Sequence, residues 1–527
     1  MESNVLQKSN ITPLRHVLTL LVLLGLAVAA RIRVTMLDFN SLLTTYLQDD
    51  AFYYYKIAAN IFNLHRITYD GEQLSNGFHP LWLILITPFY TPANDGVDFV
   101  FRVQWIMLFF ALLTVVVLYL TLLRLRASWL CAAVVTAVFC VHSTFIDMQM
   151  NGLETSLNTF MLLLLFNAFL TIFENPAVVL RRYIYFGFVA AATFLTRTDN
   201  GITLLLLFVA LAWVSRKHIP QCWPRLLLGG IVTLLLISPW LLWNQINFGS
   251  FIQGSGKIET ILWGEPHFSL ANTAISFVAM PMRLYDSMQG FAQLFISAYG
   301  GSEALAGLFL AGWIVVMLLL LINRAVSVSL CALAIFCASI FAVFCYHVGF
   351  RIFIRSWYYV PIGLMALLSV AGLVIWYCQN QSSRQPRNAI SASLLLLWLV
   401  SVLWLYSPTK LHETADQVSE HMTVADWINT NTSPDAVIGS MNSGVLSYLV
   451  HRKVINLDGV VDSRSMRAHW EKRQAAYIHE RGVNYLVDND GSLQFFCSEN
   501  ILHTCQEVYS FGYKGNPSKV MKIVDKK

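Results

Sequence analysis

The sequence predicts a polytopic α-helical membrane protein with a small extracytoplasmic α/β domain at its C-terminal end. The 527-residue chain is 56% hydrophobic and only 12% charged, and its mean hydropathy is +0.58. A soluble domain could not solvate that composition, whereas repeated apolar runs of nearly 20 residues fit helices that cross a bilayer. The net charge of +5 says little about function and gives no indication of a nucleic-acid partner.

Eleven apolar runs are predicted to span the membrane. Residues 17–30 of the first run, with Lys8 and Arg15 in front of them, resemble a signal peptide, but the run is interpreted as an uncleaved helix because so many spans come after it. The fifth and sixth runs are short. The predicted spans are residues 14–34, 100–123, 127–146, 154–175, 183–196, 200–215, 225–243, 303–322, 326–346, 357–377 and 390–407.

Positive residues between these spans predict the orientation. With the N-terminus in the cytoplasm, every inner loop carries arginine or lysine, as the positive-inside rule requires. Residues 77–90 must then not cross, and a stretch of about 14 residues with two prolines suits an interfacial or re-entrant segment. Two large loops, 35–99 and 244–302, and everything after residue 407 are then predicted to face outward.

The region after the last span has the composition of a soluble domain. Its short β-branched runs end in glycine, asparagine or aspartate, which is typical of strands, and helical segments lie between them. We therefore expect a transmembrane domain over residues 1–407 and an α/β domain over residues 408–527. Cys497 and Cys505 lie in this outer domain, where an oxidising compartment would permit a disulfide; two buried thiols are the alternative.

Ionisable residues near the span ends collect on the outer side in this topology, where such residues are functional candidates. Two of them, Arg351 and Arg355, oppose the positive-inside bias and indicate a bound phosphate, because arginine contacts phosphate oxygens in a bidentate manner. The full set is Asp49, Asp50, Asp147, Glu154, Arg197, Asp199, Arg351 and Arg355.

Each of these residues also has a structural interpretation. Asp49 could cap the helix that begins near residue 50, Asn151 and Glu154 resemble a capping box for the fourth span, and Asp199 could cap the sixth. The arginines could extend toward lipid headgroups. Taken together these explanations weaken, because capping requires neither a second acid at Asp50 nor arginines on the same face.

Several short motifs have counterparts in one family. "DAFYYYKIA" (50–58) is similar to the Asp-Glu-x-x-Tyr-x-x-Ile-Ala stretch of lipid A aminoarabinose transferases, while its Asp-Asp-Ala-Phe form, "NGFHPLW" (76–82) and "NGLETSL" (151–157) are closer to bacterial arabinofuranosyltransferases. "LTRTDNG" (195–201) is similar to a Thr-Arg-Pro-Glu-Gly turn, and "INLDGVVD" (455–462) to their outer domains. The chain thus resembles the GT-C superfamily of membrane glycosyltransferases.

The resemblance implies transfer of a sugar from a polyprenyl-phosphate-linked donor to a hydroxyl of a glycan, lipid or protein acceptor. It also implies an inverting mechanism and an active site on the periplasmic face of a bacterial inner membrane. Asp50 is expected to be the general base. Asp49 is expected to orient the acceptor, to assist, or to share a divalent ion such as Mg²⁺, Mn²⁺ or Ca²⁺, with Glu154 as a further possible ligand.

Other residues are expected to bind the substrates. The donor phosphate is expected to contact cationic side chains, namely Lys56, Arg197, Arg351 and Arg355. The sugar, isoprenoid or acceptor is expected to contact Tyr53, Tyr54, His79, Trp82, Glu154 and Asp199. His79 could equally be an interfacial histidine that precedes a proline. Membrane lipid is the remaining expected partner.

Two other functions are alternatives. A flippase of lipid-linked sugars should place its charges near the membrane midplane in broken helices, rather than at outer helix ends. An O-antigen ligase or polymerase, which moves whole glycans, is the nearest alternative among enzymes. The motifs identify neither the sugar nor the acceptor.

Overall fold

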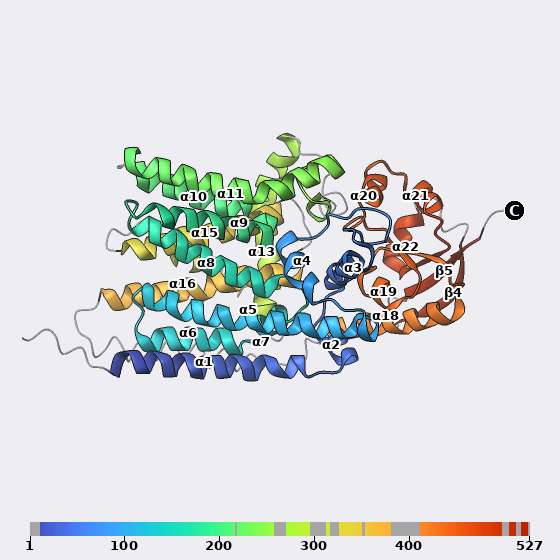
Figure 1. Cartoon of the computed structure of the whole chain (residues 1–527), viewed down its shortest axis with the longest axis horizontal. Coiled ribbons are helices and arrows are strands. Elements are labelled where there is room, and N and C mark those ends of the chain that lie inside the picture. Colours follow the sequence, from blue (N-terminus) through green and yellow to red (C-terminus); the bar gives the residue numbers. More distant parts are fainter. Residues whose placement is uncertain are drawn as a thin grey trace, which may run out of the picture.

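The structure, a computed structural model, describes residues 11–216, 219–257, 270–295, 312–316, 326–349, 354–380, 412–497, 505–512 and 518–524. Within a few helices, some side chains are left undescribed, among them those of residues 412–421 and 494–497. A bundle of long helices forms one part of the molecule and the C-terminal domain the other, with α3 (Asp49–Leu64) and α4 (Pro80–Ile86) between them (Figure 1).

Seven described helices are long and apolar enough to cross a bilayer, or eight if the bent pair α6–α7 counts as one span. This is fewer than the eleven spans predicted. The predicted fifth span corresponds to α9 (Leu180–Thr196), whose 17 residues fall just short of a span, and the predicted spans 303–322 and 390–407 lie wholly or mostly outside the described residues. The candidate spans contain α1 (Ile11–Thr35), α5 (Val97–Arg124), α8 (Thr155–Glu174), α10 (Gly201–Ser215), α11 (Ile219–Phe248), α15 (Val328–Gly349) and α16 (Tyr359–Gln379), and the bent pair is α6 (Trp129–Val141) and α7 (Ser143–Gln149).

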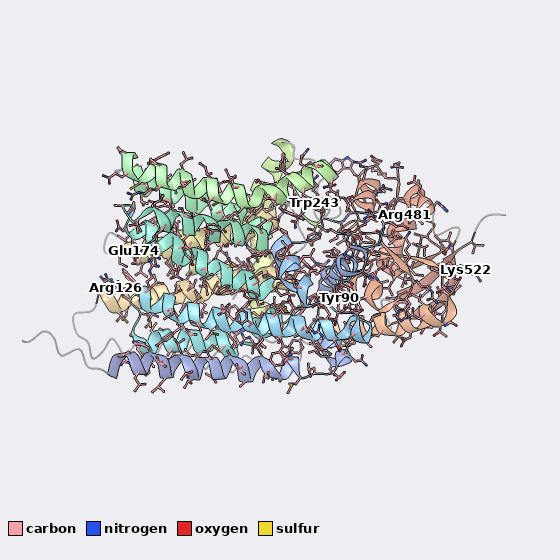
Figure 2. The ribbon with its side chains drawn as sticks, viewed as in Figure 1. Tyr90, Arg126, Glu174, Trp243, Arg481 and Lys522 are labelled. Atoms are coloured by element: carbon pink, nitrogen blue, oxygen red, sulfur yellow. The ribbon has the colours of Figure 1, made fainter. Side chains whose placement is uncertain are left out.

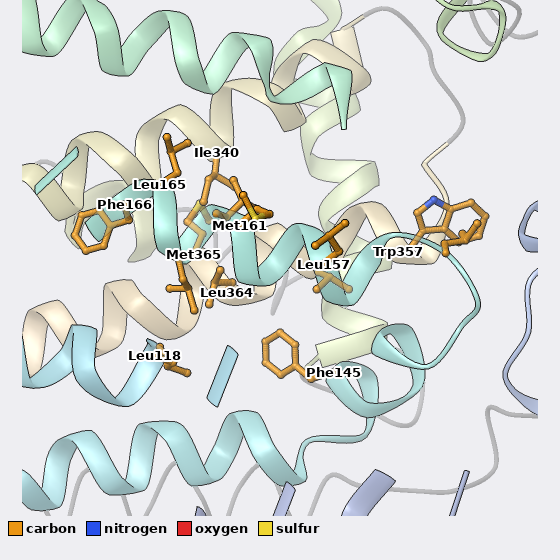
Figure 3. Packing of buried hydrophobic residues seen from close by; sticks show 14 of the residues in the cluster. Leu118, Phe145, Leu157, Met161, Leu165, Phe166, Ile340, Trp357, Leu364 and Met365 are labelled. Atoms are coloured by element: carbon orange, nitrogen blue, oxygen red, sulfur yellow. The ribbon is translucent and has the colours of Figure 1, made fainter. Parts of the chain in front are cut away.

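The centre of the bundle is α8, of which 78% of the most apolar stretch is buried. Leu157, Met161 and Leu165 recur every four residues and so lie on one face of the helix. Figure 3 shows this face against Ile340 of α15 and Met365 of α16. The packing is that of a protein interior, with apolar side chains interdigitating between helices.

Close contact between α9 and α11 depends on two glycines. A Cβ atom added at Gly187 would lie 2.4 Å from the carbonyl oxygen of Gly229, and one added at Gly229 would lie 2.9 Å from that of Tyr183. Small residues let membrane helices approach backbone to backbone. Any larger residue at position 187 would force these two helices apart.

Short elements connect the bundle to the C-terminal domain. The predicted interfacial segment 77–90 contains α4 and the 3-10 turn η1 (Thr87–Phe89), which together form an apolar helix too short to cross a bilayer. The remaining elements of this part are α2 (Phe39–Thr45), η2 (Ala93–Gly96), η3 (Thr198–Asn200), α13 (Leu270–Phe295) and η5 (Ser356–Tyr358).

The C-terminal domain has the predicted α/β architecture. Its five-stranded sheet has the order β2-β1-β3-β5-β4, in which β1 is parallel to β2 and β3 while β5 is antiparallel to β3 and β4. Separate apolar clusters lie against the sheet, one including residues of α18 and one including residues of α21. The strands are β1 (Val437–Ser440), β2 (Lys453–Asn456), β3 (Tyr485–Asn489), β4 (Cys505–Phe511) and β5 (Ser518–Ile523), and the helices are α18 (His412–Asn431), α19 (Gly444–Leu449), α20 (Ser463–Trp470), α21 (Gln474–Glu480) and α22 (Asp490–Cys497).

The two ends of the bundle differ in what they carry. Arg126 and Glu174 lie at the end far from the C-terminal domain, which is marked by Arg481 and Lys522 (Figure 2). The loop that contains Arg126, predicted to be cytoplasmic, and the domain predicted to be outside therefore lie at opposite ends of the bundle. We call the end next to the C-terminal domain the domain-bearing end.

Candidate active site

The candidate site lies at the domain-bearing end, where α3 begins. The residue before the helix, Gln48, has an extended backbone and is its N-cap, with no side-chain capping bond. The interpretation of Asp49 as the cap of this helix is therefore wrong. The tyrosines that follow, Tyr53, Tyr54 and Tyr55, are buried, so the start of α3 is enclosed between the bundle and the C-terminal domain.

Asp49 binds the C-terminal domain. Its Oδ2 accepts a hydrogen bond from the backbone N–H of Gly444 at 3.0 Å, and its Oδ1 accepts one from that of Val445 at 2.7 Å. These are the first N–H groups of α19, which have no partner within the helix. A Cβ atom at position 444 would lie 2.1 Å from the Asp49 carbonyl oxygen, so this contact requires glycine. Asp49 therefore caps a helix almost 400 residues away in the chain.

Asp50 is in a different environment from its neighbour. Its side chain is partly buried, and its carboxylate accepts no hydrogen bond from any residue that the structure describes. Burial raises the pKa of Asp50 to about 6, while the nearby charge of Arg355 lowers it and those of Asp49 and Glu154 raise it further. Asp50 thus combines unengaged oxygens with a pKa near the working range of a general base.

Glu154 lies close by in the turn before α8, and its oxygens are both engaged. Oε2 accepts a hydrogen bond from the Tyr54 hydroxyl at 3.0 Å, and Oε1 accepts one from Nη1 of Arg197 at 2.8 Å. The Nε2 atom of His79 is 3.6 Å from Oε1, and burial lowers the pKa of His79. Three sequence-predicted site residues, Tyr54, His79 and Arg197, therefore meet at Glu154.

Arg197 continues this network to Asp199. Its Nη2 donates to Oδ2 of Asp199 at 2.8 Å and its Nε donates to Oδ1 at 3.2 Å, while the guanidinium lies 4.6 Å from the centre of the Tyr358 ring. Nε2 of His347, at the end of α15, is 3.0 Å from the same Oδ2. The sequence analysis did not identify His347. It is a single histidine in an apolar helix, and its position four residues before Arg351 was the only indication of a role in the site.

These contacts correct two further structural interpretations. The N-cap of α10 is Asn200 without a side-chain bond, so Asp199 does not cap that helix. The N-cap of α8 is Glu154, also without such a bond, and Asn151 instead accepts from the Leu153 backbone N–H at 3.0 Å. Asp199 and Glu154 are bound to Arg197, and the three charges form a buried network.

The remaining residues that the sequence predicted to bind substrate differ in their burial and in their distance from Asp50. Trp82 is fully buried and its Nε1 donates to the Gly152 carbonyl at 3.3 Å, so its ring offers no face to a sugar. Burial lowers the pKa of Lys56, which forms an ion pair with no described residue. Arg351 lies outside the described residues, whereas Arg355 is close enough for its charge to act on Asp50.

The C-terminal domain contributes an acid that sequence reasoning did not identify. Asp458 follows β2, and its Oδ2 is 3.5 Å from the Tyr53 hydroxyl. Burial raises the pKa of Asp458 well above its usual range despite a hydrogen bond from Val460, and the charges of Asp50 and Asp49 contribute to the increase. The signal was available, because "INLDGVVD" places an aspartate just after a predicted strand in the outer domain.

Docking of the C-terminal domain on the first loop is tight. A Cβ atom at Gly77 would lie 1.8 Å from the Val460 carbonyl oxygen. Arg481 forms ion pairs with Asp70 and with Glu72, the second at 3.1 Å. The C-terminal domain therefore packs directly against the first loop beside the candidate site.

The residues present do not fit the divalent ion that the sequence left open. Asp49 and Glu154 each use both carboxylate oxygens in contacts within the protein. Within the described ranges, no three histidine, cysteine or acidic side chains are grouped as metal ligands. Asp49, Asp50 and Glu154 therefore do not form a metal site in this arrangement.

The disulfide prediction stays open. The side chain of Cys497, at the end of α22, lies outside those that the structure describes. Cys505 begins β4.

The fold and the site together define a multi-pass membrane protein whose acidic site is enclosed by an α/β domain. Comparison with solved structures identifies proteins that share this fold. A crystal structure of ArnT from Cupriavidus metallidurans bound to undecaprenyl phosphate is similar over 95% of this chain and 99% of that one, with a TM-score of 0.55 and 14% sequence identity. The chain thus shares the fold of that protein, in agreement with the resemblance seen in the sequence motifs.

Other comparisons are more limited. A cryo-EM structure of the mycobacterial arabinofuranosyltransferase AftD is similar over 97% of this chain but 41% of its own, with a TM-score of 0.42 and 11% identity. Residues 410–520 match a family model described as a domain of unknown function, DUF8728. None of the curated proteins matches this chain in sequence.

Proposed function

We propose that this protein transfers a sugar from a polyprenyl-phosphate-linked donor to an acceptor hydroxyl. The observation that carries the proposal is Asp50, a partly buried carboxylate with no hydrogen bond from a described residue and a pKa of about 6, close to the positive charge of Arg355. A base beside a cation suits a reaction in which a hydroxyl loses a proton while a phosphate leaves. The shared fold with ArnT, crystallised with undecaprenyl phosphate, supports the same donor class.

The proposed reaction is a single displacement. The acceptor hydroxyl gives its proton to the Asp50 carboxylate as its oxygen attacks the anomeric carbon from the face opposite the phosphate. The new C–O bond forms as the bond to the phosphate oxygen breaks, and the electron pair leaves with the lipid phosphate. Attack from the opposite face inverts the anomeric carbon. Proton acceptance by Asp50 would contribute roughly 10²–10⁴ in rate.

The leaving lipid phosphate becomes more anionic as the bond breaks. We assign its stabilisation to Arg355 and to Arg351, because arginine binds phosphate oxygens through two parallel N–H groups. Arg197 is a weaker candidate than the sequence suggested, because two carboxylates already occupy its guanidinium. Arg351→Lys and Arg355→Lys keep the charge but lose the paired donors. If both variants retain wild-type turnover and donor KM, neither arginine binds the phosphate.

The proposal includes a location and a division of the chain. Residues 1–407 form the transmembrane catalytic domain and residues 408–527 the soluble domain, on the periplasmic side of a bacterial inner membrane. Reporter fusions after residue 410 and within residues 380–388 should fall on opposite sides of the membrane. Two cytoplasmic reporters would contradict this topology.

A direct assay tests the activity. Purified protein is incubated with a panel of undecaprenyl-phosphate sugars as donors and octyl glycosides of mannose, glucose, galactose and arabinose as acceptors, and mass spectrometry follows free undecaprenyl phosphate and the extended glycoside. We expect one donor to be consumed by the wild type and by Asp38→Asn. Asp38 is an exposed N-cap of α2, where asparagine caps equally well. Asp50→Asn should be nearly inactive.

The same assay separates the alternatives. A flippase would leave every donor chemically intact. An O-antigen ligase or polymerase would consume only donors that carry whole glycans.

A further inference from the structure

We propose that Asp458 binds a hydroxyl group of the acceptor beside Asp50, so that the C-terminal domain takes part in acceptor recognition. This inference rests on the glycosyl transfer proposed above and assigns a positioning residue to it. Asp50 comes from the transmembrane part and Asp458 from the soluble domain, and the charge of Asp50 is close enough to act on Asp458.

The backbone around Asp458 holds one of its oxygens in place. Oδ1 accepts a hydrogen bond from the Val460 N–H at 2.7 Å. Asn456, at the end of β2, accepts one from the Gly459 N–H at 3.0 Å, which fixes the same turn. Among the described residues, Oδ2 has the Tyr53 hydroxyl at 3.5 Å, which is the outer limit of a hydrogen bond, and the Asn456 side chain also favours its charged form. Oδ2 can therefore accept a stronger bond from a ligand.

The turn that carries Asp458 is held against α3. Nδ2 of Asn456 donates to the Tyr53 hydroxyl at 3.3 Å and to Oγ of Ser443 at 2.9 Å, and the Tyr69 hydroxyl donates to the same Oγ. The close approach of Gly77 to the Val460 carbonyl fixes the other side of the turn. A group held in this way is positioned before the substrate arrives, which is what efficient recognition requires.

The fold itself does not need a charge at this position. No described cation forms an ion pair with Asp458, and two other carboxylates lie near it. Burying an unpaired carboxylate is costly. An asparagine would accept the Val460 hydrogen bond equally well through its carbonyl oxygen. A carboxyl group at this position is therefore explained better by a ligand than by folding.

Electrostatics indicate which substrate this ligand is. The donor phosphate is anionic and would be repelled by Asp458, as by Asp50 and Asp49. A sugar hydroxyl is neutral and can donate a hydrogen bond to the ionised carboxylate or accept one from the protonated acid, which burial favours here. The group bound by Asp458 is therefore a second hydroxyl of a polyhydroxylated acceptor, next to the one that Asp50 deprotonates.

The test compares two substitutions in the same turn. Asp458→Asn removes the charge, and Asp462→Asn is its matched control. Asp462 lies four residues later, is buried, and caps α20 through the N–H groups of Arg464 and Ser465 at 3.0 and 3.1 Å, while its other oxygen contacts the Tyr477 hydroxyl, which an asparagine amide can also hydrogen-bond. Asparagine caps helices about as well as aspartate, so the control should resemble the wild type.

Acceptor and donor kinetics are measured with the donor and octyl glycoside that the wild type uses. We expect Asp458→Asn to raise the acceptor KM about tenfold to a hundredfold, the effect of losing a hydrogen bond to a charged group. The donor KM should stay within about twofold of the wild type. Hydrolysis of the donor by water, measured without acceptor, should also be unchanged, because Asp50 remains.

Several results would overturn the inference. These are an acceptor KM of Asp458→Asn equal to that of Asp462→Asn, a donor KM that rises as much as the acceptor KM, or loss of the folded protein in Asp458→Asn alone. A second variant, Asp458→Glu, keeps the carboxyl group but moves it by one methylene. If this variant folds and its acceptor KM is as high as that of Asp458→Asn, the result supports a positioning role for Asp458. If the wild type consumes no donor, the proposed function fails, and this inference fails with it.

Discussion

Substitution of Asp50 by asparagine should make the protein slower and more stable at the same time. Asparagine keeps the shape and much of the polarity of the side chain but cannot accept the proton of the acceptor hydroxyl. Turnover should fall by roughly 10²–10⁴, which is about 3–5 kcal/mol of barrier. Because Asp50 accepts no hydrogen bond from a described residue, the substitution breaks none, although it removes the attraction between Asp50 and the charge of Arg355.

The gain in stability follows from the pKa of Asp50. Burial raises this pKa from 3.8 to about 6, so the folded state binds the proton more tightly than the unfolded chain does. The resulting stabilisation is complete below pH 4 and is lost as the pH rises through about 6. At pH 8 the ionised carboxylate therefore costs at most about 3 kcal/mol. Asparagine never ionises and avoids this cost.

Melting temperature and turnover, each measured against pH, test both effects. In detergent at pH 8, Asp50→Asn should melt above the wild type, and the difference should disappear toward pH 4, while Asp38→Asn should match the wild type throughout. Turnover of the wild type should decline on the acid side with an apparent pKa of about 6, where the base becomes protonated.

Two results would refute this reasoning. Near-normal turnover of Asp50→Asn would remove the catalytic assignment. An equal or lower melting temperature at pH 8 would show that the carboxylate is not buried at a cost. A larger loss of turnover in Asp49→Asn than in Asp50→Asn would exchange the roles of the two acids.

Three other substitutions or measurements address the surroundings of the site. Arg197→Lys keeps the charge but loses the planar guanidinium, which donates to Asp199 through two nitrogens and to Glu154 through the third. Disrupting a buried network costs up to about 3–5 kcal/mol, so the melting temperature should fall by several degrees, and wild-type melting would show that the network contributes little. Asp49→Ala loses two charged hydrogen bonds to α19, worth about 1.5–3 kcal/mol each, and should speed proteolysis of the C-terminal domain more than it slows turnover; unchanged proteolysis would contradict the docking role. Thiol labelling of denatured, unreduced protein should leave Cys497 and Cys505 unmodified if they form a disulfide, whereas full labelling of both excludes it.

The sequence by itself determined the class of structure. The length of an apolar run indicates whether a helix can cross the hydrophobic core of a bilayer, and β-branched runs between turn residues indicate strands. The helical bundle and the C-terminal α/β domain could therefore both be predicted. These signals are local, since each depends on one short stretch of chain. The same locality explains why, among the described residues, one predicted span has no full-length counterpart: α9 has the apolar composition of a span but only 17 residues.

Only the tertiary structure decided what each polar residue does. Asp49 and Asp50 are neighbours with the same chemistry, yet Asp49 caps α19 while the carboxylate of Asp50 stays free of described hydrogen bonds. Sequence patterns suggest local caps, but hydrogen-bond partners are set by which distant segments the fold brings together. Long-range packing buries Trp82 in the interior and places Asp458 beside the candidate site. Burial and partner choice depend on long-range packing, which no short motif records.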